Sequence, residues 1–213
     1  AHVRLSHAAL LLGVAEDGKV YVSATCNARS TQSIADLRGY IFEWDPSGAF
    51  PATPFLDFSL DYSRTSIMSP TNWQPWPATS NSYPKQRTPL LTNIGFDRGD
   101  LVLSVADLLG LVTINSVGET SGGDILRVCK SGASWALENA GSCGSYPAHQ
   151  YGAVNHEGLG DGEYYWNDDG GEDDYLGAGV ASAHGYRETI VTGIDIRTHG
   201  NWQGVAYIDN QTG

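Results

Sequence analysis

The stretch "GDLVLSVAD" (residues 99–107) decides the fold, because it is an almost unbroken apolar run of strand length. After an insert it is followed by "GGDILRVCKSGASW" (122–135), which alternates between apolar and polar residues and then turns through Lys130-Ser-Gly132. Short runs rich in β-branched and aromatic residues, separated by Gly, Asp, Asn and Pro, predict strands and turns. The sequence therefore predicts an all-β protein.

The same pair of segments occurs three times along the chain. An earlier copy consists of "GKVYVSA" (18–24) and "RGYIFEWDPSGAF" (38–50), and a later one of "RETIVTGID" (187–195) and "WQGVAYIDNQTG" (202–213). Repeated small sheets that each bury a face on their neighbour are typical of β-propellers. We therefore expect a single all-β, β-propeller-like domain over residues 1–213, with about three blade units and long loop inserts.

Composition excludes several classes of function. The net charge of the 213 residues is −12, so the chain lacks the excess of Lys and Arg that binding to nucleic acid or to an anionic membrane requires. No apolar run reaches the roughly 20 residues that span a bilayer, so membrane insertion is not expected. The apolar run "HAALLLGVA" (7–15) is expected to form a buried strand.

Three cysteines are present, and two of them are spaced for a disulfide. Cys129 and Cys143 bracket a turn and a strand, and a bridge between them would contribute about 3 kcal/mol in the chain-entropy model. The alternative is a pair of reduced thiols. Cys26 is the odd residue, either free and buried or paired outside this chain.

Several of these segments together resemble a known family. Their order is "GKVYVSATCNA", "ADLRGYIFEWDP", "NWQPW", "TNIGFDRGDLVLSVAD", "GGDILRVC", "SWALENAGSCG" and "GEYYW". It is similar to the propeller-like region of large secreted bacterial surface proteins that carry serine-aspartate-repeat (SdrD-type) B domains. The resemblance implies a β-propeller fold and an extracellular, cell-surface or matrix location, and it implies no established activity.

The chain departs from that family in two respects. A cysteine-containing segment precedes "NWQPW" in the family, whereas this chain has "DYSRTSIMSPTNW" (61–73), which leaves Cys26 without that partner. Three repeats also do not close a ring of four or more blades. The chain is therefore expected to be a fragment, to complete its sheets with another copy, or to be an open variant.

The stretch "GEYYWNDDGGEDDYLG" (162–177) combines aromatic residues with carboxylates. Calcium takes six to eight oxygen ligands, and a glycine-containing acidic loop can supply them, although the spacing matches no EF-hand. A solvated acidic loop is the alternative. The candidate calcium ligands are Asp168, Asp169, Glu172, Asp173 and Asp174.

Two groups of aromatic residues could serve as platforms for glycans. Tyr164, Tyr165 and Trp166 stand beside the acidic residues, where rings could cover sugar faces and carboxylates could bind hydroxyl groups. Trp73 and Trp76 of "NWQPW" form the second group. The alternative for both groups is packing within the fold, with the tryptophans capping the end of the propeller.

Motifs for catalysis are weak. Glu163 and Glu157 are the best candidates for a glycosidase carboxylate pair, and His149, His156 and Glu157 for a transition-metal site. No nucleophile elbow, phosphate loop or dinucleotide fingerprint occurs. Asn210 begins a match to the N-glycosylation pattern.

The sequence thus favours an extracellular structural or adhesive module without catalytic residues. Such a module would bind glycan or matrix protein, or would assemble with other copies of itself through unpaired strand edges. A carbohydrate-active enzyme (glycosidase or lyase) on a propeller scaffold and a calcium-dependent lectin are the alternatives, and calcium is the one cofactor expected.

Overall fold

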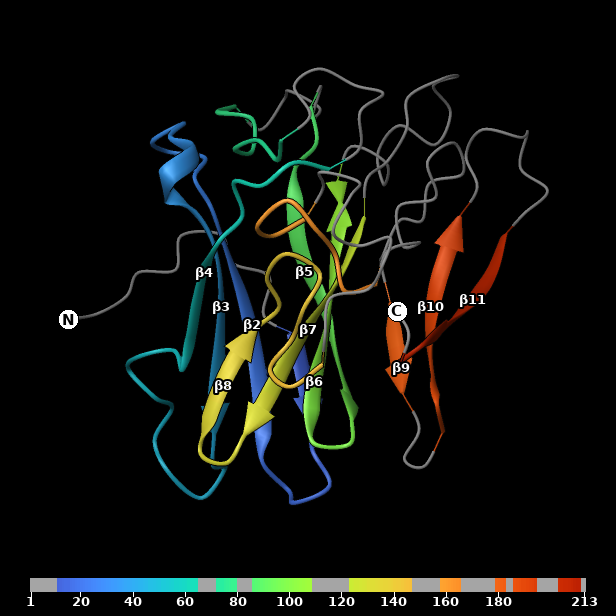
Figure 1. Ribbon diagram of the computed structural model, residues 1–213. Coiled ribbons are helices and arrows are strands. Elements are labelled where there is room, and N and C mark those ends of the chain that lie inside the picture. The colour runs from blue at the N-terminus through green and yellow to red at the C-terminus, as the bar shows by residue number, and fades with distance from the viewer. Residues whose placement is uncertain are drawn as a thin grey trace.

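The regular structure in the computed structural model consists almost entirely of β-strands (Figure 1). The described residues are 11–64, 72–79, 86–108, 123–146, 158–165, 179–182, 186–194 and 203–211. Their elements are eleven strands and a short 3₁₀ helix, η1 (Ile34–Asp36). The prediction of an all-β protein is confirmed.

The strands form three antiparallel sheets, and in each sheet the strands are neighbours in sequence order. The first sheet contains β1 (Leu11–Val14), β2 (Val20–Asn27), β3 (Leu37–Trp44) and β4 (Leu56–Ser59). The second contains β5 (Pro89–Asp97), β6 (Asp100–Asp107), β7 (Asp124–Ser131) and β8 (Ser134–Leu137). The third contains β9 (Val180–Ser182), β10 (Glu188–Ile194) and β11 (Gln203–Asp209).

The three repeated sequence pairs fall in three different sheets. They become the antiparallel neighbours β2 and β3, β6 and β7, and β10 and β11. The sequence pattern predicted the run 7–15 that contains β1, but it missed the first strands of the other two sheets, β5 and β9. These first strands hold the sheets together, because β5 packs against β1 and β2, and β9 packs against β5 and β6. The second sheet therefore lies between the other two (Figure 1).

The strand β6 shows why its sequence is an almost continuous apolar run. Leu101 and Leu103 are fully buried in the core between the first and second sheets. Val102, which points to the other face, is fully buried in the core between the second and third sheets. A strand with both faces covered has no position for an exposed polar residue.

A tight turn joins β5 to β6 and brings two aspartates opposite each other. Arg98 and Gly99 have φ values of +51° and +90°, as a two-residue hairpin of the I′ kind requires. The residues on either side, Asp97 and Asp100, are therefore direct cross-strand partners. Both aspartates are buried.

One strand is less buried than its sequence predicts. The run 7–15 is expected to be a buried strand, and its described part contains β1. Leu12 and Val14, however, are 61% and 66% exposed. They lie on the face of the first sheet that points away from the second sheet, because Gly13 between them points toward Ile94 of β5.

Candidate functional site: a pocket at the hairpin ends and a buried ionic network

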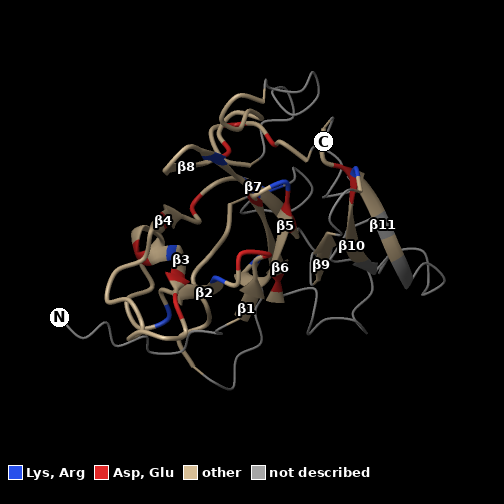
Figure 2. Ribbon diagram, turned by 90° about the horizontal axis from the view of Figure 1, so that it is seen from below, with Lys and Arg blue, Asp and Glu red and all other residues tan. Residues whose placement is uncertain are grey.

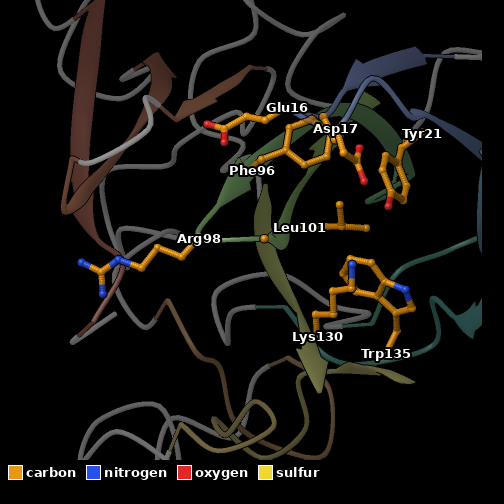
Figure 3. A pocket seen from close by; sticks show the side chains of 10 residues that line it. Glu16, Asp17, Tyr21, Phe96, Arg98, Leu101, Lys130 and Trp135 are labelled. Atoms are coloured by element: carbon orange, nitrogen blue, oxygen red, sulfur yellow. The ribbon is translucent and has the colours of Figure 1, made fainter. Parts of the chain in front are cut away.

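A pocket of about 370 Å³ opens at the hairpin end of the first two sheets (Figure 3). It is formed by the β1–β2 turn, the β5–β6 turn and the β7–β8 hairpin, so its lining comes from segments far apart in the sequence. Figure 2 looks onto this end of the molecule, where acidic and basic residues lie among the turns. The lining includes Glu16, Asp17, Tyr21, Phe96, Arg98, Leu101, Lys130 and Trp135.

Three aromatic rings form the apolar part of the pocket. The ring of Tyr21 meets Phe96 at 5.6 Å and Trp135 at 6.1 Å between centroids, both edge to face. Tyr21 is buried, whereas Phe96 and Trp135 are half-buried and offer ring surface to a ligand. Burial, together with a hydrogen bond from its hydroxyl to Glu43, raises the pKa of Tyr21, so this ring stays neutral.

The charged groups around the rings are mixed in sign. Glu16 and Asp17 are exposed and come from one turn, while the ammonium group of Lys130 stands over the Trp135 ring, 5.1 Å from its centroid. Arg98 extends away from the aromatic rings (Figure 3). Rings that carry apolar surface, with donors and acceptors at the rim, suit a small amphipathic group such as a sugar residue.

A second cluster, the Arg127 network, is buried between the second sheet and the third. The Arg127 guanidinium donates to Asp97 at 2.7 Å and to Asp100 at 2.7 and 3.2 Å. It also donates to the Tyr165 hydroxyl at 3.0 Å and to the Asn210 carbonyl at 3.2 Å. Burial opposes its charge, but Tyr165 and the two carboxylates outweigh burial and raise the pKa of Arg127.

Glu138 lies next to this network and is buried as well. Its carboxyl oxygens accept from the backbone N–H groups of Arg127 at 2.5 Å and Tyr164 at 3.1 Å. Burial, and then the charge of Asp124, raise the pKa of Glu138 to about 8 in spite of these donors. Glu138 therefore holds a proton at a pH where an exposed glutamate has lost it.

The predicted catalytic carboxylates do not form an open pair in the described residues. Glu163 is 1% exposed and forms an ion pair with Arg64, which also faces Asp124 at 3.4 Å. The Glu163 carboxylate is therefore buried in an ion pair and is not exposed to a substrate. The partner expected for it, Glu157, lies outside the described residues.

The predicted glycan platforms mostly belong to the interior. Trp73, Tyr164 and Tyr165 are 0% exposed, so the expected glycan contact is not open to them, because each ring is enclosed by its neighbours. Trp76 is half-buried and donates through its indole N–H to the Pro89 carbonyl at 3.1 Å. Trp166 lies outside the described residues.

The predicted disulfide is confirmed. Cys129 and Cys143 are bridged, with their Cα atoms 5.7 Å apart, and the bond ties β7 to the segment that follows β8. Cys26 is free and half-buried. The candidate calcium ligands at 168–174, and the residues His149 and His156, lie outside the described residues. Within the described residues, no three His, Cys, Asp or Glu side chains form a group that could hold a metal ion.

Asn210, which begins the match to the N-glycosylation pattern, is an internal hydrogen-bonding residue. Its side-chain oxygen accepts from Tyr165 at 2.9 Å and from Thr189 at 2.7 Å, and the side chain is 1% exposed. A glycan on its amide nitrogen would require the third sheet to leave the second. The match to the pattern is therefore not accessible in the folded chain.

The sequence carried a signal for both sites. The pocket residues Tyr21, Phe96 and Trp135 each stand three positions from a glycine (Gly18, Gly99 and Gly132), and glycine is a common turn residue. The Arg127 network is visible as one arginine inside an apolar strand, together with the sequence Asp97-Arg-Gly-Asp100. Neither pattern says which segments meet, because the pairing of the sheets is a tertiary property.

Comparisons with known proteins identify one related protein. No model of a protein family matches the chain, and no solved structure matches it. The chain is 27% identical to Colossin-D of Dictyostelium discoideum in an alignment of 211 positions that covers 92% of this chain and 21% of that protein. The chain thus spans about a fifth of the length of this relative. No described helix is long and apolar enough to cross a bilayer.

Proposed function

We propose that this chain is an extracellular structural or adhesive module, built of blade-like sheets, that contacts a glycan through the pocket at the hairpin ends. The observation that carries the proposal is the aromatic wall of Phe96 and Trp135, which is half open to solvent and lies beside charged rim residues. Sugar rings present apolar faces and hydroxyl edges, which these two kinds of surface complement.

Two features support the location and the arrangement. The disulfide between Cys129 and Cys143 favours an oxidising compartment, such as the cell surface or the matrix. Each sheet is a meander, and the first strand of the second and of the third sheet packs on the sheet before it, as is expected of successive propeller blades. The family resemblance of the sequence points to the same fold and location.

The alternatives have less support. A glycosidase would need two carboxylates on either side of the bond that is cut, but Glu16 and Asp17 come from one turn and Glu163 is buried. A calcium-dependent lectin stays a prediction for the acidic residues at 168–174. Its test is whether removing calcium with a chelator lowers both the melting temperature and the retention of glycans.

A glycan array of neutral and acidic oligosaccharides tests the proposal. We expect Trp135→Leu to weaken binding of a retained oligosaccharide about tenfold, the loss of about 1.4 kcal/mol of ring contact. Trp44→Leu is the matched control, because Trp44 is also half-buried but lies on the first sheet away from the pocket. The proposed ligand is wrong if no oligosaccharide is retained, or if both variants lose binding equally.

A further inference from the structure

The first and second sheets, and the second and third sheets, are joined by the same kind of contact. In the first contact, Ile94 of β5 lies against Gly13 of β1, so closely that a Cβ atom on Gly13 would be 3.0 Å from the Ile94 Cβ. In the second, β9 lies against Gly95 of β5, where a Cβ atom would be 3.0 Å from the Ser182 Oγ and 3.6 Å from a methyl group of Val180. A missing side chain lets the next sheet approach in both cases.

The two glycines occupy equivalent positions. Gly13 pairs with Tyr21 across β1 and β2, and Gly95 pairs with Val102 across β5 and β6. Tyr21 packs in the core toward the second sheet, and Val102 packs in the core toward the third. Each glycine therefore marks the face that its sheet turns toward the following sheet.

The third sheet has a residue equivalent to Gly13 and Gly95, and the face of the sheet at this residue is exposed. There Ile190 of β10 pairs with Ala181 of β9, and both side chains are exposed. The neighbouring Val191 is 1% exposed and packs toward the second sheet, so Ile190, and not Val191, is the equivalent of Val102. Ala181 is thus the counterpart of Gly13 and Gly95 on a face that no described segment covers.

β1 carries an exposed residue of the kind that could pack against Ala181. The residues that approach the glycines, Ile94 and Val180, are 5% and 6% exposed, and each directly precedes the small residue of its own strand. Leu12 precedes Gly13 in the same way, but is 61% exposed. Across the strands, Leu12, Ile94 and Val180 also have equivalent partners, which are Val22, Leu103 and Val191.

Further apolar residues extend both open faces. Tyr207 pairs with Ile190 across β10 and β11 and is 64% exposed, and Val205, on the same side of β11, is 53% exposed. Val14 is 66% exposed beside Leu12 on the first sheet. Contiguous exposed apolar residues of this kind mark interaction surfaces in soluble proteins.

We propose that the open face of the third sheet binds β1 of a second copy of this chain, with Leu12 of one copy against Ala181 of the other. A second copy is the partner that fits, because the exposed face of β1 and the exposed face of the third sheet are equivalent to the two surfaces that already pack together twice within one chain. The contact is head to tail, so two copies can satisfy both faces of each other in a ring of six sheets. This inference rests on the blade-like arrangement in the proposed function.

The state of assembly in solution tests the proposal. The net charge of −12 makes copies repel each other, so sedimentation and light scattering are measured in about 0.5 M NaCl, where the screening length is about 4 Å. We expect the mass to rise from one chain to two between about 1 µM and about 1 mM protein, the range that weak association spans. A mass of one chain throughout would overturn the proposal.

Two surface variants locate the contact. Leu12→Lys and Ala181→Arg each change an exposed residue and are expected to weaken association at least tenfold without lowering the melting temperature. Ile34→Lys is the matched control, since Ile34 is an exposed apolar residue of η1, on neither of the two faces. An unchanged mass for both variants would contradict the assigned faces.

Mixing the two variants gives the sharpest result. Leu12→Lys keeps an intact third sheet, and Ala181→Arg keeps an intact β1. The mixture can therefore form one contact between two unchanged faces, whereas neither variant alone can form such a contact. We expect a mixed dimer that dissociates more easily than the natural one. Two variants that stay monomeric together would exclude head-to-tail binding, and because mass is measured without glycan, this failure is separate from failure of the proposed ligand.

Discussion

Arg127→Met is expected to lower the free energy of unfolding by about 3–5 kcal/mol, as is typical when one partner of a buried ion pair is removed. Methionine keeps much of the volume but leaves Asp97 and Asp100 buried without their cation. It also removes the donors to Tyr165 and Asn210 that hold the third sheet against the second. Urea unfolding followed by fluorescence and by circular dichroism measures the change.

Two further variants control for the loss of a positive charge. Arg38→Met breaks the surface ion pair with Asp57 and is expected to cost about 1 kcal/mol or less. Adding Asp100→Asn to Arg127→Met should recover part of the loss, because one buried charge is then removed. A cost for Arg127→Met that is no larger than that for Arg38→Met would show that the Arg127 network does not hold the sheets together.

The free energy of unfolding is expected to fall by up to about 5 kcal/mol as pH rises from about 4.5 to above 8, because of Glu138. Its pKa is raised to about 8 in the folded chain from 4.5. The folded state therefore holds the proton more tightly than the unfolded state, and the stabilisation that is complete at low pH is lost as pH rises through the folded pKa. Urea unfolding between pH 5 and pH 9 measures this slope.

Glu138→Gln separates Glu138 from the other groups that titrate in this range. Glutamine cannot lose a proton, so the fall in stability with pH should be smaller in the variant. At pH 5 the variant should be less stable by about 1–3 kcal/mol, because one of the backbone N–H groups of Arg127 and Tyr164 then faces an amide NH₂ group. Parallel slopes for the two proteins would assign the pH dependence to other residues.

The sequence predicted the repeated strand pairs because their local pattern is strong. β6 is apolar on both faces because it lies between two sheets, and β7 ends in a glycine turn because a tight hairpin joins it to β8. The first strands were predicted less well, because β1 lies within the predicted run 7–15 but β5 and β9 were missed. β1 contains Gly13 and β5 contains Gly95, and glycine weakens a strand pattern, yet these two glycines make the close approach of the sheets possible.

The sites were harder to predict for a different reason. From the sequence, Trp73 and Tyr165 could be either glycan platforms or residues packed within the fold, because they stand beside proline or acidic residues. In the fold the Tyr165 hydroxyl meets Arg127, and Trp73 packs against Tyr62, at 6.4 Å between ring centroids. Exposure of an aromatic residue in a long insert depends on what the insert folds against, and no local pattern reports that.

A designed disulfide tests the stacked arrangement of the sheets most directly. The Ser182 Oγ lies 3.0 Å from where a Cβ atom on Gly95 would stand, a separation that two bonded cysteines can span. With Cys26→Ser to remove the free thiol, Gly95→Cys and Ser182→Cys should bond to each other when the folded chain is oxidised. Alkylation of the unfolded, unreduced protein counts the remaining thiols.

The control places the second cysteine elsewhere. Gly95→Cys combined with Ser47→Cys, in the exposed turn after β3, should leave both engineered thiols reactive. In the variant with Gly95→Cys and Ser182→Cys, no thiol should be alkylated if β9 packs on β5, because the two engineered cysteines are then bonded to each other. Two reactive thiols per chain would mean that the third sheet does not pack on the second through its first strand, and would contradict the blade-like arrangement.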